Sequence, residues 1–341
     1  MTKITIQDVA QRAGVSVATI DRVLNHRPGV RSQTVEKVET AIRELNYQPD
    51  RIAARLARGR EYRLWFILPN TTGEFMQAIA DEVEASAVRM SGERVAIMVK
   101  KIDVFDGELL AHTLDGLEEN VDGVAVVALD HPAVREAINA LVGRGVTVVT
   151  LVSDVPGSKR THFAGIDNSS AGRTAAGLMG RFLRGQKGKV ALFAGSLSLR
   201  DHIERKYGFE QVMTQEFQHL EVLSVPESRD DVERSQSLTQ TLLEQHHDLI
   251  GIYNVGGGTK GVVAGLEAST RAREIVFIAH EVTDGSRRAL IKGTIDAIIN
   301  QDAGHEVRSA VRVLIAKADN APLVEAQERI RIDIFMRDNL P

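Results

Sequence analysis

Residues 4–24 constrain the fold of this chain most, because they predict two short capped helices joined by a tight turn. Apolar residues recur with the helical period over residues 6–13. Thr5 can cap this first helix, and Asp8, three residues on, completes a pattern like a capping box. Gly14 can adopt the left-handed turn at the helix end without steric cost. A second helix is therefore expected directly after this turn.

The second predicted helix, residues 17–24, has the features of a DNA-recognition helix. Ser16 can cap it, and Ile20, Val23 and Leu24 form its inward face. The residues left facing outward are Val17, Ala18, Asp21 and Arg22. An arginine here can donate two hydrogen bonds to guanine, and small apolar groups can contact a thymine methyl. The spacing thus predicts a helix–turn–helix that enters a major groove.

A third helix is expected over residues 32–45, where Val35, Val38, Ile42 and Leu45 share one face and would close a three-helix core. The alternative is an ordinary small helical bundle with a solvated basic face. The capped turn, the register and the net charge together favour DNA readout.

Residues 47–60 are expected to form a hinge helix and linker. The run from Arg51 to Gly59 is rich in alanine and arginine, and it is too short to be a stable helix alone. Such a segment can fold on DNA, where Arg51 and Arg55 would neutralise phosphates and Leu56 would wedge into the minor groove. A flexible linker is the alternative, but no Ser or Gly precedes Gly59 within this run.

These residues resemble the start of the LacI/GalR family of bacterial transcription regulators, which begins D-V-A-x-x-A-G-V-S-x-x-T-[VI]-S-R-V-L-N. The matching residues are Asp8-Val9-Ala10, Ala13-Gly14-Val15-Ser16, Thr19-Ile20 and Arg22-Val23-Leu24-Asn25. The resemblance implies base-reading positions at 17, 18 and 22 and a minor-groove wedge at Leu56. The expected DNA-binding residues are Thr5, Ser16, Val17, Ala18, Thr19, Asp21, Arg22, Asn25, Arg51, Arg55 and Leu56.

Asp21 is a departure from the family, which usually has Ser at this position. A carboxylate close to phosphate is unfavourable, so a phosphate contact is not expected from this residue. Two hypotheses remain for Asp21. It either accepts a hydrogen bond from a cytosine amino group or pairs with a nearby arginine and orients it.

Charge separates the chain into two regions. Residues 1–60 hold 11 Lys/Arg and 6 Asp/Glu, about +5, whereas the whole chain carries −4. A basic head on an acidic body confines nucleic-acid contact to the head, and affinity for DNA should fall steeply with salt. The chain has no cysteine, and no metal or cofactor is expected. No apolar run approaches the ~20 residues of a membrane span and no signal peptide is evident, so a cytoplasmic protein is expected.

From residue 61 onward, strand and helix signals alternate. Helical stretches, such as 76–90 and 132–142, lie between short apolar runs rich in β-branched residues. The predicted strands are 63–69, 94–100, 123–129, 146–152, 189–195, 249–255 and 274–280. This rhythm predicts an α/β body with parallel, doubly wound sheets.

The family resemblance extends to this body and implies two lobes like those of periplasmic sugar-binding proteins. The expected organisation is a head at 1–46, a body at 61–341, lobe 1 at 61–162 and 292–323, and lobe 2 at 163–291 and 324–341. The run at 328–341 resembles the family's last strand, and no tetramerising tail is expected after it. A homodimer is expected, because two heads are needed to read two half-sites.

Polar residues follow many of the predicted strands, where an open parallel sheet binds its ligands. The run Arg205-Lys-Tyr-Gly-Phe matches the family's R-x-x-G-[FY], whose arginine usually binds the effector. Planar polar side chains suit vicinal hydroxyls, and an aromatic ring can cover a sugar's apolar face, so a sugar or polyol is expected. For each polar residue the alternative is a strand-end cap or a solvated turn. The expected effector-binding residues are Asn70, Phe75, Asp130, Ser153, Asp154, Arg205, Asn254, Glu281 and Gln301.

Two departures separate this chain from relatives of known effector. Relatives commonly show Asn-Asp where this chain has Asn254 followed by Val-Gly-Gly-Gly-Thr-Lys, and they often have an aromatic residue at the position of Ala303. The glycine run suggests a phosphate cradle formed by backbone N–H groups, but it lacks the G-x-x-x-x-G-K-[ST] spacing. A plain tight turn is therefore favoured.

The sequence predicts a DNA-binding transcriptional regulator, and a repressor in particular. Effector binding would close the cleft and change the pairing of two hinge helices on DNA. The first rival is an enzyme on the same body, but His280-Glu281 and His305-Glu306 each lack a second spaced His, and no G-x-S-x-G or dinucleotide fingerprint occurs. The second rival is a free sugar-binding protein, which the head and the lack of an export signal oppose.

Overall fold

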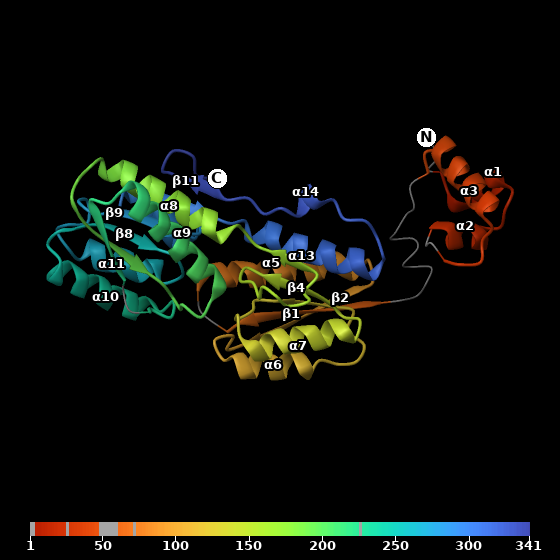
Figure 1. Ribbon diagram of the computed structural model, residues 1–341, viewed down its shortest axis with the longest axis horizontal. Helices are drawn as coiled ribbons and strands as arrows, with labels where there is room; N and C mark the ends of the chain where they lie inside the picture. The colour runs from red at the N-terminus through yellow and green to blue at the C-terminus, as the bar shows by residue number, and fades with distance from the viewer. Residues whose placement is uncertain (1–3, 25–26, 48–60, 71–72, 225–226) are drawn as a thin grey trace. The chain divides into compact units, whose positions relative to one another are not determined.

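The computed structural model describes residues 4–24, 27–47, 61–70, 73–224 and 227–341. The chain divides between Glu61 and Tyr62 into an N-terminal head and a larger body, which are described separately (Figure 1). The expected hinge helix lies outside the described residues, and so do the expected DNA contacts Asn25, Arg51, Arg55 and Leu56. None of the described helices is both long and apolar enough to cross a membrane.

The head is a three-helix unit, as predicted. Thr5 Oγ1 accepts from the Asp8 N–H at 3.4 Å and the Thr5 N–H donates to Asp8 Oδ2 at 2.8 Å, which completes the capping box. Gly14 takes the left-handed conformation, with φ 66°. The helices are α1 (Ile6–Ala13), α2 (Val17–Leu24) and α3 (Ser32–Glu44). Their buried core consists of Val9, Ala10, Ile20, Val23, Val38 and Ala41.

Lobe 1 of the body is built on a parallel sheet with the strand order β2-β1-β3-β4-β5. Helices α5 and α13 cover one face of the sheet, and α6 and α7 cover the other (Figure 1). The strands are β1 (Tyr62–Pro69), β2 (Val95–Ile102), β3 (Gly123–Val126), β4 (Thr147–Leu151) and β5 (His162–Ala164). The helices are α5 (Glu74–Ser91), α6 (Gly107–Asp115), α7 (Pro132–Gly143) and α13 (Ala303–Ala318).

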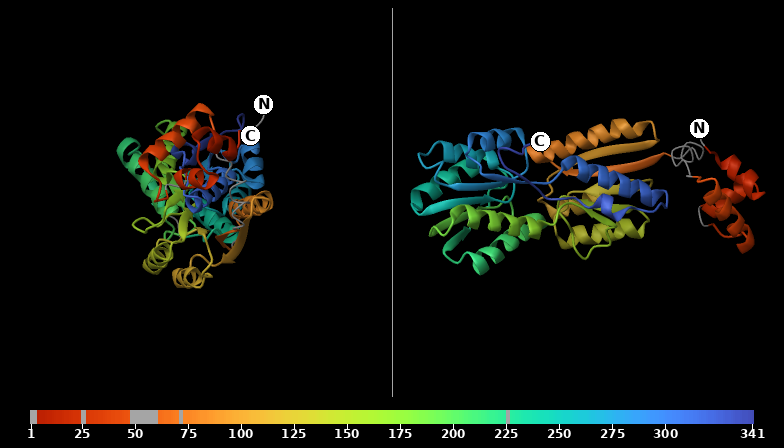
Figure 2. Two further views of the ribbon diagram at one scale, coloured as in Figure 1. Left: turned by 90° about the vertical axis from the view of Figure 1, so that its right-hand side faces the viewer. Right: turned by 90° about the horizontal axis from the view of Figure 1, so that it is seen from above.

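Lobe 2 has a second sheet with the order β11-β10-β9-β8-β6-β7, in which only the edge strand β11 among the described strands runs antiparallel to its neighbour. Helices α8 and α9 pack on one face, and α10, α11 and α12 on the other (Figures 1 and 2). The strands are β6 (Gly188–Phe193), β7 (Leu220–Ser224), β8 (Leu249–Asn254), β9 (Val276–His280), β10 (Ala297–Asn300) and β11 (Asp333–Phe335). The helices are α8 (Asn168–Leu183), α9 (Arg200–Glu216), α10 (Val232–Gln245), α11 (Thr259–Glu267) and α12 (Asp284–Lys292).

The chain crosses between the lobes at positions that differ from those predicted. Strand β5 pairs with β4 in lobe 1, so the boundary expected after residue 162 is too early. Strand β10 pairs with β9, so residues 292–300 belong to lobe 2 and the crossover follows Asn300. Residues 325–328 form α14, whose Glu328 accepts a hydrogen bond from Ser309 Oγ of α13 at 2.6 Å. The last crossing therefore follows Glu328 instead of residue 323.

Candidate functional site

Helix α2 presents the side chains expected to read bases. Val17 is 40% exposed, and Ala18 and Arg22 are exposed too. Ser16 Oγ accepts from the Thr19 N–H at 3.2 Å, so these two residues fix the start of the helix. Thr5 performs the same role for α1. The exposed face of α2 can thus enter a groove without disturbing the core of the head.

Asp21 lies beside a cation. Its Oδ2 atom is 3.4 Å from Arg27 Nη1, and both side chains are partly exposed. This contact matches the second of the two hypotheses for Asp21, in which the carboxylate orients an arginine.

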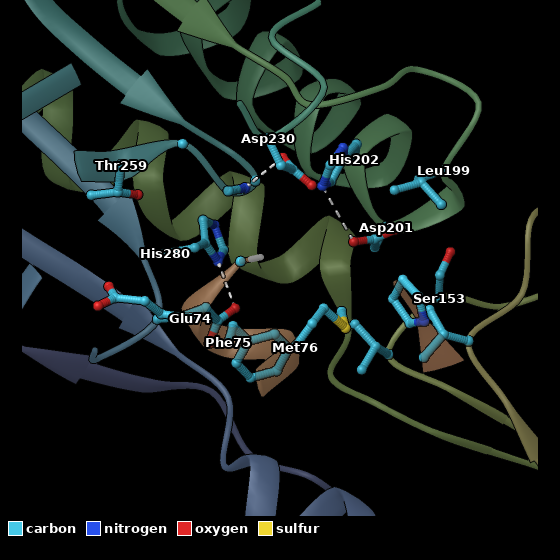
Figure 3. A pocket seen from close by; sticks show the side chains of 18 of the residues that line it. Glu74, Phe75, Met76, Ser153, Leu199, Asp201, His202, Asp230, Thr259 and His280 are labelled. Carbon is cyan, nitrogen blue, oxygen red and sulfur yellow. Dashed lines mark hydrogen bonds and ion pairs between the residues drawn. The ribbon is translucent and has the colours of Figure 1, made fainter. Parts of the chain in front are cut away.

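The body contains a pocket in the cleft between the two lobes, with a volume of about 160 Å³ (Figure 3). Its walls come from strand ends and the first turns of helices, as the position of ligand sites in parallel sheets predicts. Five of the expected effector residues line it: Phe75, Ser153, Arg205, Glu281 and Gln301.

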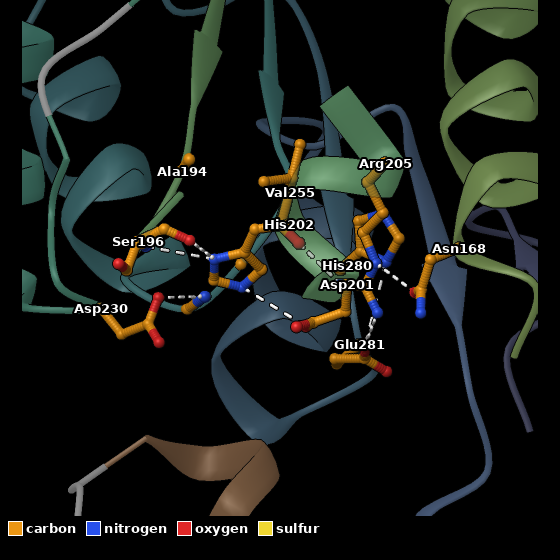
Figure 4. Close-up of polar contacts among 12 residues, drawn as sticks. Asn168, Ala194, Ser196, Asp201, His202, Arg205, Asp230, Val255, His280 and Glu281 are labelled. Carbon is orange, nitrogen blue, oxygen red and sulfur yellow. Dashed lines mark hydrogen bonds and ion pairs between the residues drawn. The ribbon is translucent and has the colours of Figure 1, made fainter. Parts of the chain in front are cut away.

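Arg205 is the central cation of the lobe 2 wall (Figure 4). Its Nε donates to Asn168 Oδ1 at 2.8 Å, and its Nη1 donates to the Val255 carbonyl at 2.6 Å. Its Nη2 lies 3.8 Å from Glu281 Oε1, and no described residue accepts a hydrogen bond from it. The residue is 2% exposed, so it is held rigidly while its Nη2 group remains without an acceptor among the described residues.

Glu281 is held by Gln301 beside this arginine. The Gln301 side-chain amide donates to Glu281 Oε1 at 2.7 Å, and its backbone N–H donates to Oε2 at 3.2 Å. Burial raises the pKa of Glu281 to about 7, although Arg205 and Gln301 act in the opposite direction. Glu306 lies fully buried nearby, and burial together with the Glu281 charge raises its pKa well above the usual value. The Glu281 carboxyl group therefore changes its protonation near neutral pH.

Two histidines complete the lobe 2 wall. His280 Nε2 is hydrogen-bonded to the Tyr253 hydroxyl at 2.8 Å. Burial, with the charges of Arg205 and His202, lowers the pKa of His280 well below its usual value, so the ring is neutral. His202 Nδ1 lies 3.0 Å from the Ser196 carbonyl, and its Nε2 lies 3.6 Å from Asp201 Oδ2. In the described part of the chain neither His280 Nδ1 nor Asp201 Oδ1 has a hydrogen-bond partner.

Asp201, His202 and Asp230 also line the pocket, although they were not among the predicted effector residues. The first two could have been found, because they precede Arg205 by four and three positions and share its face of α9. Asp230 reaches the pocket through a contact that is remote in sequence, since the Gly257 N–H donates to its Oδ1 at 2.7 Å.

Side chains of the protein are hydrogen-bonded to the backbone of the glycine-rich turn after β8. Asp230 takes the Gly257 N–H, and Asn254 Nδ2 donates to the carbonyls of Gly256 and Gly257 at 3.1 and 2.9 Å. A Cβ atom at Gly257 would lie only 2.7 Å from the Cβ of Asp230. These contacts agree with a tight turn and oppose a phosphate cradle.

Four expected effector residues are absent from the described lining of the pocket: Asn70, Asp130, Asp154 and Asn254. Asn70 is exposed, and its backbone N–H donates to the Ile102 carbonyl. Asp130 accepts from Arg135 at 2.7 Å, and Asp154 accepts from Arg160 and from Thr150 Oγ1. Asn254 holds the glycine turn. For Asp130 and Asp154 the contacts correspond to the alternative given above, in which a strand-end polar group is engaged within the protein.

The lobe 1 wall is mainly apolar, and one of its acids contacts lobe 2. Phe75 and Met76 lie opposite His202 and Asp230 across the pocket (Figure 3). Glu74, the first residue of α5, forms an ion pair with Lys260 of α11 at 2.7 Å. Although burial opposes it, hydrogen bonding to Lys260 and Thr283 lowers the pKa of Glu74, so the group is ionised. This pair joins the two lobes beside the pocket.

Two family models match the chain. A model described as a periplasmic binding protein domain matches residues 64–322, and the model for bacterial regulatory proteins of the lacI family matches residues 5–50. Two solved structures share the fold of the body. The glucose-galactose binding protein GanP of Geobacillus stearothermophilus has a TM-score of 0.72 and 22% identity, covering 83% of this chain and 99% of that one. A solute-binding protein of Burkholderia graminis in complex with D-arabinose has a TM-score of 0.74 and 23% identity, covering 82% and 96%.

Curated relatives include bacterial regulators. The HTH-type transcriptional regulator PtxS of Pseudomonas plecoglossicida is 32% identical over 171 residues, which is 50% of this chain and 48% of that protein. The lactose operon repressor of Escherichia coli is 29% identical over 214 residues, 63% of this chain and 57% of that protein. The ribose operon repressor of Halalkalibacterium halodurans is 26% identical over 264 residues, 73% and 70%. The chain thus spans about half the length of the first two relatives.

The fold and the cleft place the body in the class of two-lobed periplasmic binding protein domains. With the matching head, the chain belongs to the LacI/GalR family of bacterial transcription regulators.

Proposed function

We propose that the protein is a DNA-binding transcriptional repressor whose operator affinity is controlled by a small polar effector, a sugar or polyol, bound in the cleft. One observation carries the proposal: a single chain joins a lacI-type head to a pocket whose lobe 2 wall holds buried, unpartnered polar atoms within the described residues. Relatives named for the lactose and ribose operons support both parts.

The head reads its operator through the exposed face of α2, with Val17 and Ala18 against thymine methyls and Arg22 on guanine. The test is a selection of bound duplexes from a randomised pool by the full chain. A defined sequence should be enriched, and Arg22→Ala should lose preference at one or two positions. Arg43→Ala, an exposed change on α3, is the matched control and should keep the preference. Enrichment of no sequence would contradict a sequence-reading head.

Asp21 orients Arg27 in this proposal instead of reading a cytosine, in line with their 3.4 Å contact. Asp21→Ser would then lower affinity for the selected duplex without changing its sequence. A changed base at one position would favour the cytosine contact instead.

The effector contacts are proposed to be Phe75, Ser153, Arg205, Glu281 and Gln301. A thermal-shift screen of the full chain against sugars, polyols and sugar phosphates tests this, since a ligand specific for the native state raises its stability. No shift with any of these compounds would contradict the effector class and leave the DNA selection unaffected.

We further propose that the protein acts as a homodimer in the cytoplasm and catalyses no reaction. A dimer would present two heads to two half-sites. Sedimentation of the full chain with the selected duplex should give two chains per duplex. Chemical conversion of a bound sugar would contradict the proposal that the protein catalyses no reaction and would favour the enzyme alternative.

A further inference from the structure

In each wall of the pocket, the residue that directly follows a central strand has a left-handed backbone conformation. Val152 follows β4 in lobe 1 with φ 64°, and Glu281 follows β9 in lobe 2 with φ 66°. The N–H of Val152 donates to the Ala164 carbonyl of β5 at 2.9 Å, and the N–H of Glu281 donates to the Ile299 carbonyl of β10 at 3.0 Å. Both residues line the pocket. They are therefore structurally equivalent positions on opposite walls.

Val152 is an unusual residue for this conformation. The left-handed region disfavours β-branched side chains, and Asn, Asp or Gly adopts it more readily. Val152 is nevertheless buried, with 2% exposure, in the apolar core of lobe 1 that also reaches the pocket at Phe75 and Met76. Strain of this kind is concentrated at binding sites. Position 152 therefore carries an apolar side chain although its backbone conformation favours Gly, Asn or Asp.

The remainder of the lobe 1 wall has the same character. Pro69, Val104, Phe105 and Val127 line the pocket beside Val152. The neighbouring Ser153 contributes a hydroxyl that is buried and lacks a partner in the described part of the chain. This wall can bury an apolar part of a ligand, but it offers few hydrogen bonds to a hydroxyl group.

The lobe 2 wall is polar. Four of its buried side chains carry a polar atom that has no hydrogen-bond partner among the described residues: Arg205 Nη2, His280 Nδ1, Asp201 Oδ1 and Gln301 Oε1. Each of these residues lines the pocket and is at most 5% exposed, so a bound ligand can supply hydrogen bonds that the protein leaves unmade. This wall therefore suits hydroxyl groups, which can both donate and accept.

Charge and size limit the ligand further. Asp201, Asp230 and Glu281 line the pocket together with Arg205, and Lys260 is engaged by Glu74, so a phosphate or carboxylate would meet more acidic than basic side chains. The volume of about 160 Å³ resembles that of a cavity of about 150 Å³ that holds benzene, which is a single ring.

We propose that the effector is an uncharged, single-ring sugar or polyol with one apolar end, such as a deoxy or O-methyl sugar, and that Val152 selects for that end. The polar edge binds to lobe 2, and the apolar end packs on lobe 1. A hydroxyl at that end would lie against the apolar side chain of Val152, which offers it no hydrogen bond. The inference rests on the proposed effector site, but it does not depend on which operator the head reads.

Titration calorimetry of the full chain with matched pairs tests the proposal: D-fucose and D-galactose, L-rhamnose and L-mannose, and methyl glucoside and glucose. In at least one pair the deoxy or methyl member should bind at least 10-fold more tightly than its hydroxylated partner. Glucose 6-phosphate should bind more weakly than glucose. Tighter binding of the hydroxylated member in each pair would overturn the proposal, and so would binding by none of these sugars. Either result leaves the DNA selection untouched and is thus distinct from failure of the regulator.

Two variants test the role of Val152. Val152→Asn suits the backbone and adds a polar group, so it should reverse the preference within the bound pair by about 10-fold or more. Val152→Gly also relieves the backbone but adds no polar group, so it should weaken the deoxy member without strengthening the hydroxylated one. If Val152→Asn leaves the preference unchanged, Val152 does not select the apolar end. If Val152→Asn fails to fold, the affinities of Val152→Gly for the deoxy and the hydroxylated member decide the question.

Discussion

Lobe 1 and lobe 2 present equivalent strand ends to the pocket, yet they carry opposite chemistry. At Val152 the backbone holds an apolar side chain in the core of lobe 1, and at Glu281 it holds a carboxyl group within a network of Arg205 and Gln301. The shared fold determines where the ligand lies, whereas the side chains determine which part of it each lobe binds. The lobes therefore need not contribute equally to affinity, and the difference can be measured.

The largest effect is expected from the polar wall. Arg205→Ala removes the hydrogen bonds to Asn168 and Val255 and leaves Glu281 without its neighbouring cation. Loss of one partner of a buried charged cluster typically weakens binding by about 2–5 kcal/mol, so effector affinity should fall at least 30-fold. Calorimetry measures it, with Arg173→Ala on the exposed face of α8 as the control. Near-normal affinity of Arg205→Ala would show that the polar wall is not the main anchor.

A second effect concerns pH and belongs to the same wall. Burial raises the pKa of Glu281 to about 7 in the folded protein. The contribution of this group to stability is therefore fully present at a pH below its pKa in the unfolded chain, and it is lost as the pH rises through 7. The loss amounts to about 3 kcal/mol when the group ionises fully. Glu281→Gln should therefore lose less stability than the wild type between pH 5 and 9.

Urea unfolding across this pH range measures that difference. Glu306→Gln is the companion variant, since its buried carboxyl has a raised pKa and contributes with the same sign. His280 has the opposite effect. Because its pKa in the folded protein is lowered, stability is lost as the pH falls below the usual pKa of a histidine. For that reason, the difference between each variant and the wild type is the quantity to compare. Identical pH profiles for wild type and Glu281→Gln would contradict the raised pKa.

The apolar wall should contribute less per side chain. Phe75→Ala removes part of the surface that would cover the ligand, and we expect a loss of about 1–2 kcal/mol in effector affinity. The loss should be greater for a deoxy sugar than for its hydroxylated partner. Val88 lies on the same helix and is 77% exposed, so Val88→Ala provides the control in the same titration. An equal loss for both sugars would remove the distinction between the walls.

The smallest effect is expected from the ion pair that joins the walls. Glu74→Gln breaks the contact with Lys260, whose side chain is 48% exposed, so the change is about 0–1 kcal/mol and is reduced by salt. Effector affinity should fall a few-fold because the closed arrangement loses a contact. Glu267→Gln breaks a pair of equal length, with Lys292, inside lobe 2 and should leave affinity unchanged. The same change in both variants would mean that the Glu74 pair has no special role in closure.

The sequence predicted local features better than remote ones. The head was predicted well because its caps and turn depend on residues three or four apart, such as Thr5 and Asp8. The central strands and Arg205 were predicted from apolar runs and a family motif. The crossover after β10 was misplaced because a four-residue strand gives little periodic signal. Asp230 depends on a contact with Gly257, and the left-handed backbone of Val152 depends on tertiary packing, so neither could be predicted from neighbouring residues.

If effector binding in the cleft is coupled to DNA binding by the head, a reciprocal titration will measure the coupling. The affinity of the full chain for its selected duplex is measured with and without saturating effector, and effector affinity is measured with and without duplex. Both affinities should change by the same factor, about 5–150-fold, and Arg205→Ala should abolish the change at the same effector concentration. Operator affinity that is independent of a ligand bound in the cleft would contradict it.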